Sequence, residues 1–437
     1  MTIGSTFLGR LRRSAWYRRR RFGASFGFVA AMMLVLPPLA RGGGLYMNEL
    51  STTAQANAGA GRVAWAPDAS ATLHNPALMT ELSDHGFAAG FSLVFGNVHF
   101  DADAAPDPST GTGNGGNQAG IAPLASMSYV HVLSDRVRLG FSFYSISGSV
   151  LDPSNDWAGR YQMTELSLLT ISLSPVVAVR VTDWLSVGAG PVISYGVLDW
   201  KLKAPLPFPP GAETKVHLDE LDDWQAAARI GVTLKPHEDV SLGVYYNSET
   251  KFELSGNVQL GGLGPGNLDT DMPLAQFVEV GAHWQVSDRL ALLASFDWED
   301  WSAADDLDIT IGGNRIAAGT GFEDTYKVGL GANYRAADDW LIQGGVAFDT
   351  SAFRNKDRTA AIPIDRQVRV SIGAQHEISD ALTLGGSFTY VNLGSAEIRA
   401  NTVRGDYQDN DLFILGLTLA FDRLPWNGMA TFAGTNP

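Results

Sequence analysis

The sequence predicts an all-β transmembrane barrel of 14 antiparallel strands with an N-terminal hatch, or plug, inside the lumen. Three observations support this fold class. Segments in which apolar and polar residues alternate with period 2 recur along the chain, and their connections alternate between short turns and longer loops. No stretch after residue 42 approaches the roughly 18 uninterrupted apolar residues that a transmembrane helix needs.

The first 42 residues have the pattern of a signal peptide. Seven arginines lie between Arg10 and Arg21, and Phe26 to Leu36 is an apolar run of 11 residues, too short to span a bilayer. The small residues Ala40 and Gly42 then provide a cleavage site. A basic amphipathic surface helix is the alternative. The pattern favours export to the cell envelope.

The composition is compatible with that location. The chain has no cysteine, so no disulfide chemistry is required of it. Removal of residues 1–42 takes eight of the 31 basic residues and none of the 46 acidic ones, which leaves a net charge of −23. Such acidity argues against nucleic acid as a partner and is ordinary for long solvated outer loops.

The strands are expected in 14 segments, each with period-2 alternation or a close approach to it. They cover 87–100, 122–133, 136–148, 166–181, 184–203, 223–236, 239–260, 276–287, 289–311, 324–336, 339–353, 366–379, 381–400 and 408–421. From 326 to 335, for example, one face reads Tyr, Val, Leu, Ala, Tyr and the other Lys, Gly, Gly, Asn, Arg. Parity places Lys327, Arg369, Glu279 and His283 on the lumen face, where a plain polar lining is the alternative to a binding role.

The connections separate a barrel from a soluble sandwich. Six short turns alternate with seven longer loops rich in Gly, Pro and Asp, as expected if both chain termini lie in the periplasm. Trp184 and Trp340 stand near short turns, and Trp200, Trp224, Trp298 and Trp301 stand nearer the long loops, which resembles the two aromatic girdles of a barrel. The last strand ends at Phe421, and residues 422–437 are expected to be a periplasmic tail.

Residues 43–86 differ from the strands, since they are rich in Ala, Gly, Ser, Thr and Asn without a period-2 run. About 44 residues rarely fold alone, and a 14-stranded barrel has an interior to fill. A hatch inside the barrel satisfies both facts, whereas a disordered periplasmic leader is the alternative. Within this segment, Asn75-Pro76-Ala77 has the chemistry of a defined turn.

Residues 44–50 (GLYMNEL), 68–70 (DAS) and 75–78 (NPAL) resemble the N-terminal hatch of the FadL family of outer-membrane transporters. The similarity continues in order through 121–123 (IAP), 324–331 (DTYKVGLG), 345–349 (GVAFD) and 362–366 (IPIDR). The resemblance implies passive uptake of long-chain fatty acids or similar hydrophobic molecules, by binding in a plugged lumen and lateral release into the membrane. It implies no cofactor, ATP or ion gradient, and a monomer in contact with outer-membrane lipid is expected.

The resemblance also suggests site residues. Leu45 and Met47 would reach the binding pocket, unless the terminus is frayed, and Lys327 would pair with a carboxylate head group. Glu323 stands where family members can be basic, which makes a carboxylate ligand less certain. Ala125, Ser145 and Gly148 would line a lateral opening beside a kink in the third strand. The alternative for these small residues is a closed wall, with an axial exit to the periplasm.

Other functions find less support in the sequence. Family members that carry aromatic hydrocarbons are the first alternative, and an open diffusion porin is the second. The G-x-S-x-G match at 23–27 lies in the signal segment, so an outer-membrane enzyme is not expected. The eight His form no H-x-x-x-H pair, and Asp305, Asp306 and Asp308 are typical solvated strand-end acids, so no metal site is expected either.

Overall fold

The structure is a computed structural model that describes residues 46, 50–103, 113–145, 148–206, 211–261, 265–304, 306–311, 314–319, 321–399 and 403–421. The predicted signal peptide, residues 1–42, and the predicted tail, residues 422–437, lie outside the described residues. Leu45 and Met47 lie outside them as well. None of the described helices is long and apolar enough to cross a bilayer.

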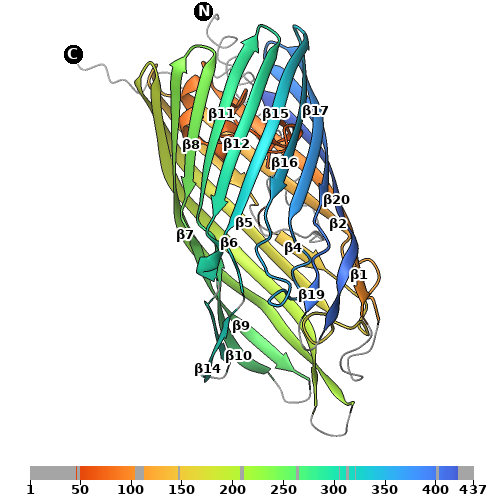
Figure 1. Ribbon diagram of the computed structural model, residues 1–437. Coiled ribbons are helices and arrows are strands. Elements are labelled where there is room, and N and C mark those ends of the chain that lie inside the picture. The colour runs from red at the N-terminus through yellow and green to blue at the C-terminus, as the bar shows by residue number, and fades with distance from the viewer. Residues whose placement is uncertain are drawn as a thin grey trace, which may run out of the picture. The chain divides into compact units, whose positions relative to one another are not determined.

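One sheet of 20 β-segments forms the described wall (Figure 1). The segments are β1 (Gly86–Ala102), β2 (Ile121–Val132), β3 (Val137–Tyr144), β4 (Gly148–Leu151), β5 (Glu165–Thr182), β6 (Leu185–Pro205), β7 (Glu213–His237), β8 (Val240–Asn247), β9 (Thr250–Leu260), β10 (Pro265–Leu274), β11 (Phe277–Ser287), β12 (Leu290–Glu299), β13 (Asp306–Ile311), β14 (Asn314–Gly319), β15 (Thr325–Ala337), β16 (Trp340–Asp349), β17 (Gln367–Ser379), β18 (Leu382–Asn392), β19 (Ile398–Arg399) and β20 (Arg404–Phe421).

These segments form a closed antiparallel barrel of 14 wall strands, as predicted. Six wall strands consist of two successive segments each, namely β3/β4, β8/β9, β10/β11, β12/β13, β14/β15 and β18/β19. Closure comes from β1, which pairs antiparallel with β2 on one side and with β20 on the other; Phe91 faces both Ala125 and Leu417. Closure therefore leaves neither the first nor the last wall strand as a free edge.

The outer parts of the wall extend further than predicted. β7 begins at Glu213 rather than 223, and β10 and β14 occupy residues expected in loops. Their Gly, Pro and Asp content suggested loops, but β10 pairs with β9 and β14 with β13. Backbone pairing needs no apolar alternation in a hairpin that does not face lipid, so the sequence pattern does not reveal these segments.

The predicted alternation of faces is confirmed. Glu279, Lys327 and Arg369 are buried, with 1, 2 and 5% of their surface exposed, whereas their neighbours Val280 and Val328 point outward and expose 45 and 50%. Trp184, Trp224 and Trp340 are exposed on the wall as predicted for interfacial girdles.

The prediction for Trp301 is wrong, because this side chain is only 2% exposed. β12 ends at Glu299, and the short 3₁₀-helix η2 (Trp301–Ala304) follows it. The turn of η2 breaks the alternation of the strand and directs the indole inward. The Trp301 ring packs on Tyr46 and Phe322 instead of contacting lipid.

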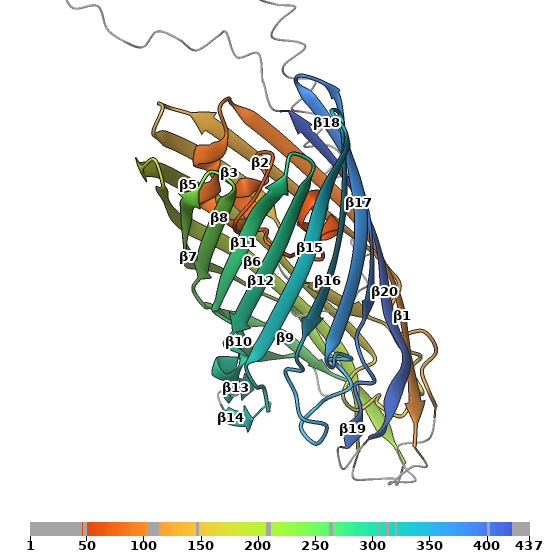
Figure 2. The ribbon, with the colours of Figure 1, turned by 45° about the horizontal axis from the view of Figure 1, so that its top comes forward.

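The predicted hatch, here described from Leu50 to Leu82, lies inside the ring of strands, in the upper part of the barrel as drawn in Figure 2, and most of its residues are buried. It contains the helices α2 (Thr52–Ala56) and α3 (Ala71–His74) and the 3₁₀-helix η1 (Pro76–Glu81), and every residue of α2 and α3 is buried. Hydrogen bonds join it to distant parts of the wall: Thr52 N to Thr418 Oγ1 of β20, and Asn57 Nδ2 to Asn333 Oδ1 of β15. The domain boundaries 43–86 stay a prediction.

Inward-facing glycines allow this close packing. A Cβ added at Gly188 of β6 would lie 2.7 Å from both Ala77 N and Pro76 C of η1. Real Cβ atoms essentially never approach other heavy atoms so closely, so only glycine fits there. The glycines of the lumen face therefore form the surface on which the hatch backbone rests.

Candidate ligand-binding site and lateral opening

Tyr46 separates two cavities in the lumen, each of about 30 Å³. Its hydroxyl donates to Ala275 O, and its ring packs on Phe277 and Trp301 with centroids 5.5 and 5.0 Å away. The first cavity is bordered by Trp301, Thr325, Asp349, Phe353, Ile364 and Asp365, and the second by Leu50, Arg62, His74, Tyr144, Tyr245 and Glu279; Tyr46 and Glu299 border both. A volume near 30 Å³ holds no more than a few water molecules. An alkyl chain therefore enters only if Tyr46 or the hatch moves.

A large apolar cluster adjoins Tyr46. It combines residues from the wall and from the loops that follow it, among them Phe100, Trp157, Phe252, Phe353 and Tyr407. The Phe100 ring packs against Trp157 and Tyr407, with centroids 5.6 and 5.1 Å away. The cluster therefore places buried aromatic and aliphatic side chains next to Tyr46.

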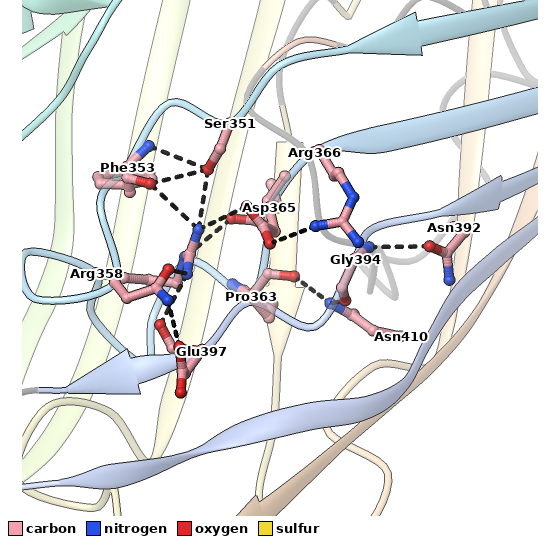
Figure 3. Close-up of polar contacts among 12 residues, drawn as sticks. Ser351, Phe353, Arg358, Pro363, Asp365, Arg366, Asn392, Gly394, Glu397 and Asn410 are labelled. Carbon is pink, nitrogen blue, oxygen red and sulfur yellow. Dashed lines mark hydrogen bonds and ion pairs between the residues drawn. The ribbon is translucent and has the colours of Figure 1, made fainter.

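The loop between β16 and β17 is fixed over the first cavity by Arg358, whose side chain is fully buried (Figure 3). The guanidinium donates to Glu397 O at 2.8 Å, Ser351 Oγ at 2.9 Å and Asp365 Oδ1 at 3.0 Å. Because Asp365 and its neighbour Ile364 border the cavity, Arg358 positions part of the cavity wall without contacting a ligand itself. The sequence analysis did not identify this residue, although it lies four residues before the matched segment 362–366.

The predicted lumen charges lie together as ion pairs. Arg62 of the hatch binds Glu279 Oε2 at 2.8 Å, Arg369 Nη1 lies 3.4 Å from Asp349 Oδ2, and the Lys327 ammonium contacts Asp297. Lys327 thus faces the lumen as expected, but its ammonium group already forms an ion pair with Asp297. Its role as a head-group ligand stays a prediction.

The turn motif Asn75-Pro76-Ala77 lies between the hatch and the wall. Asn75 Oδ1 accepts from Ala77 N at 3.0 Å, which caps η1, while Nδ2 donates to Val63 O at 2.7 Å and to Val232 O of β7 at 3.2 Å. Beside it, Ser51 Oγ lies 2.9 Å from His74 Nε2. Burial lowers the pKa of His74 well below its usual value, with a smaller contribution from Arg62, so this imidazole is neutral.

The wall is interrupted between β2 and the third wall strand. Pairing of β2 with β3 ends at Ser126↔Tyr144, and β4 pairs with β5 from Gly148↔Leu169 onward. Among the described residues, no ladder joins β4 to β2, although residues 121–125 of β2 still pair with β1. This interruption of the described ladder lies where a kink in the third strand is expected, and the lateral opening itself stays a prediction.

The residues expected at this opening lie together. Ala125 and Ser145 border one cavity of about 10 Å³, together with Leu50, Ser51 and Thr52 of the hatch. Ser126 Oγ donates to Leu50 O, so the hatch backbone is bound to the inner rim of the gap. Gly148 is the first residue of β4. Ile146 and Ser147 lie outside the described residues.

A second interruption, between β5 and β6, is of a different kind. The ladder is interrupted between Leu173↔Ile193 and Val177↔Ala189, around Pro175 and Pro191, and it resumes in the same register. Ser174 Oγ donates to Pro191 O at 2.6 Å across the skipped residues. The two strands therefore separate locally without a change of register, and the ladder continues on both sides of the skipped residues.

Comparison with known proteins identifies the class of transporter. A profile of the family described as "Outer membrane protein transport protein (OMPP1/FadL/TodX)" matches residues 33–419. The chain belongs to this family. It is therefore an outer-membrane transporter of hydrophobic compounds and not an enzyme.

Individual relatives agree with this assignment. The chain is 25% identical to outer membrane protein P1 of Haemophilus influenzae, with 86% of this chain and 92% of that protein covered. It is 24% identical to the long-chain fatty acid transport protein of Salmonella typhi, with 87 and 93% covered. Among solved structures, a FadL homologue of Pseudomonas aeruginosa matches with a TM-score of 0.80 at 20% identity, covering 87% of this chain and 99% of that one. The Pseudomonas putida toluene transporter TodX matches with a TM-score of 0.67 at 14% identity, covering 88 and 99%.

Proposed function

We propose that this barrel takes up long-chain fatty acids or similar hydrophobic molecules passively and releases them sideways into the membrane. The ligand passes from the outer apolar cluster to the cavities around Tyr46. It then leaves between β2 and the third wall strand, past Ala125 and Ser145. Fatty acids are favoured by the relatives named as long-chain fatty acid transport proteins.

The observation that carries the proposal is the unpaired stretch of β2 beside the hatch. Unpaired backbone groups facing lipid are costly, so such a gap is tolerable only where other polar groups cover it. Hatch residues Leu50 to Thr52 border the gap from inside. A closed wall would continue its ladder through these positions, as the wall does between β1 and β2.

Binding of a hydrophobic ligand is favourable without further help, so the structure has to provide a way to release it. Burial of one CH₂ is worth roughly 0.8 kcal/mol, so a sixteen-carbon chain would gain on the order of 10 kcal/mol in an apolar site. Movement of the hatch rim at Leu50 would dismantle the site and open the gap in one step. Neither ATP nor an ion gradient is needed for such a step.

Transport of aromatic hydrocarbons is the second candidate. The cavity beside Tyr46 is small and bordered by Trp301 and Phe353, which suits a compact ring as well as it suits an alkyl terminus. The two candidates differ in ligand, not in route.

Uptake by cells that express the chain distinguishes these candidates. Labelled oleate and labelled toluene are supplied to expressing cells and to vector controls, and the purified protein is examined in planar bilayers. We expect oleate uptake above the control and no steady conductance, because the hatch fills the lumen. A steady open-channel current would contradict the plugged-barrel proposal and favour a diffusion porin. Uptake of toluene alone would identify the ligand as aromatic.

A further inference from the structure

Arg229 is a fully buried cation in the lumen that the sequence analysis did not single out. It lies on β7 in phase with the inward-facing Gly231 and Thr233, and it is 0% exposed. Its guanidinium reaches β3, which is separated from β7 by β5 and β6. Arg229 Nη2 donates to Ser142 Oγ at 3.1 Å, and Cζ lies 6.0 Å from the centroid of the Tyr144 ring.

The charge of Arg229 has no counter-ion among the described residues. Arg229 Nε and Nη1 find no acceptor there, and its contacts to Ser142 and to Tyr245 are with neutral hydroxyls. By contrast, the lumen cations Arg62, Lys327 and Arg369 each contact a carboxylate. A buried charge is unfavourable unless an opposite charge or sufficient hydrogen bonds accompany it. The unmatched donors at Arg229 thus suit an anion.

Arg229 lies directly behind the border of the second cavity on the proposed ligand path. Tyr144 and Tyr245, which contact its side chain, border the 30 Å³ cavity together with Leu50. Leu50 also borders the cavity at Ala125 and Ser145. Tyr144 is the last residue of β3 that pairs with β2 before the gap. The guanidinium therefore stands next to the inner side of the lateral opening.

We propose that Arg229 binds the anionic head group of an amphiphilic ligand, a carboxylate on an apolar chain, just before the ligand leaves through the gap. This inference rests on the proposed function and adds the residue that recognises the head group. Glu279 and Glu299 border the same cavity and repel an anion, and Arg62, which also borders it, is already paired with Glu279. The side of the cavity towards Tyr144 is therefore left for the carboxylate. Arg229 thereby replaces Lys327 as the expected head-group ligand, because Lys327 is already paired with Asp297.

The test compares oleate with methyl oleate, which differ in charge but share the apolar chain. Affinities are measured on purified protein in a non-ionic detergent for the wild type, Arg229→Met, Arg229→Lys and the matched variant Lys327→Met. The wild type is expected to prefer the acid. Arg229→Met should lose about tenfold or more in affinity for oleate and little for the ester, since hydrogen bonds to charged groups contribute at this level. Lys327→Met should change both ligands equally, and Arg229→Lys should keep most of the preference.

The outcomes separate this inference from the proposed function. If Arg229→Met keeps the wild-type preference for the acid, or if Lys327→Met alone abolishes it, Arg229 is not the head-group ligand. Heat-modifiable gel mobility shows whether each variant folds. If Arg229→Met does not fold, the folded Arg229→Lys variant decides, because it keeps the positive charge. A loss of its preference for the acid as large as the loss predicted for Arg229→Met would overturn the role of the charge. Competition by sodium acetate as strong as by oleate would overturn an amphiphile as the ligand. If the wild type binds oleate and methyl oleate with equal affinity, only the inference about Arg229 is overturned. If the wild type binds neither ligand, the proposed function itself is overturned.

Discussion

Substitution of Gly188 by alanine tests whether the hatch is held by close backbone packing. The new Cβ would lie 2.7 Å from Ala77 N and Pro76 C, about 0.7 Å short of the 3.4 Å at which ordinary contact begins. Both atoms belong to the backbone of the capped turn at Asn75, so no flexible side chain can relieve the overlap. Overpacking of this kind costs about 1 to 3 kcal/mol. The hatch should therefore open about 5 to 150 times more often.

Gly385→Ala is the matched control. This glycine also faces the hatch, but its added Cβ would meet Thr52 Cγ2 at 3.5 Å, an ordinary contact. Hydrogen exchange of residues 71–82 in the folded protein measures the opening, since amides such as Leu78 N, bonded to Asn75 O, exchange only when the turn opens. We expect lower protection in Gly188→Ala alone, with the strand amides unchanged in both variants. Wild-type protection of the hatch in Gly188→Ala would refute the reasoning.

Three further predictions concern the hatch and the outer loop. Deletion of Asn75-Pro76-Ala77 should leave the barrel folded but reduce oleate uptake, because the turn joins the hatch to β7; normal uptake at equal surface expression would exclude this role. Leu45→Asp should weaken ligand binding by placing a charge in an apolar site, and unchanged affinity of the folded variant would favour a frayed terminus. Arg358→Met should free the loop over the first cavity, at a cost of about 3 kcal/mol in local stability, because Asp365 loses its closer, buried ion-pair partner and Ser351 Oγ and Glu397 O lose their donor; proteolysis at the loop, compared with Arg354→Met at the exposed Arg354, would reveal it, and equal cleavage of the two variants would count against it.

The wall could be predicted from the sequence because the alternation of apolar and polar residues in each lipid-facing strand shows which side faces the lumen. Alternation around Lys327 and Arg369 identified the lumen face, and the short turns fixed the strand order. The inward turn at Trp301 could not be predicted in this way, since it depends on a 3₁₀-turn that interrupts the period. The segments β10 and β14 were missed because their Gly, Pro and Asp content indicated loops, although β10 pairs with β9 and β14 with β13.

The site was predictable only in part. Ala125 and Ser145 came from a resemblance, whereas the Asn75 turn came from its residue chemistry together with the resemblance. The structure brings Ala125 and Ser145 to one cavity. Arg229 had the right parity, since Gly231 and Thr233 follow it at the same spacing, but its missing counter-ion is a property of the folded lumen. A pattern along one strand does not show which acid lies opposite across the barrel.

Closure of the gap between β2 and the third wall strand tests the proposed lateral route most directly. Ala125→Glu combined with Ser145→Arg should fill the gap with bulk and a cross-strand ion pair, whereas the volume-neutral exchange Ala125→Ser with Ser145→Ala should not. Oleate uptake is measured at equal surface expression, with folding confirmed by heat-modifiable gel mobility. Our account predicts a large loss of uptake in the folded charged variant and normal uptake in the exchange variant. Normal transport by the charged variant would contradict lateral release and favour an axial exit to the periplasm.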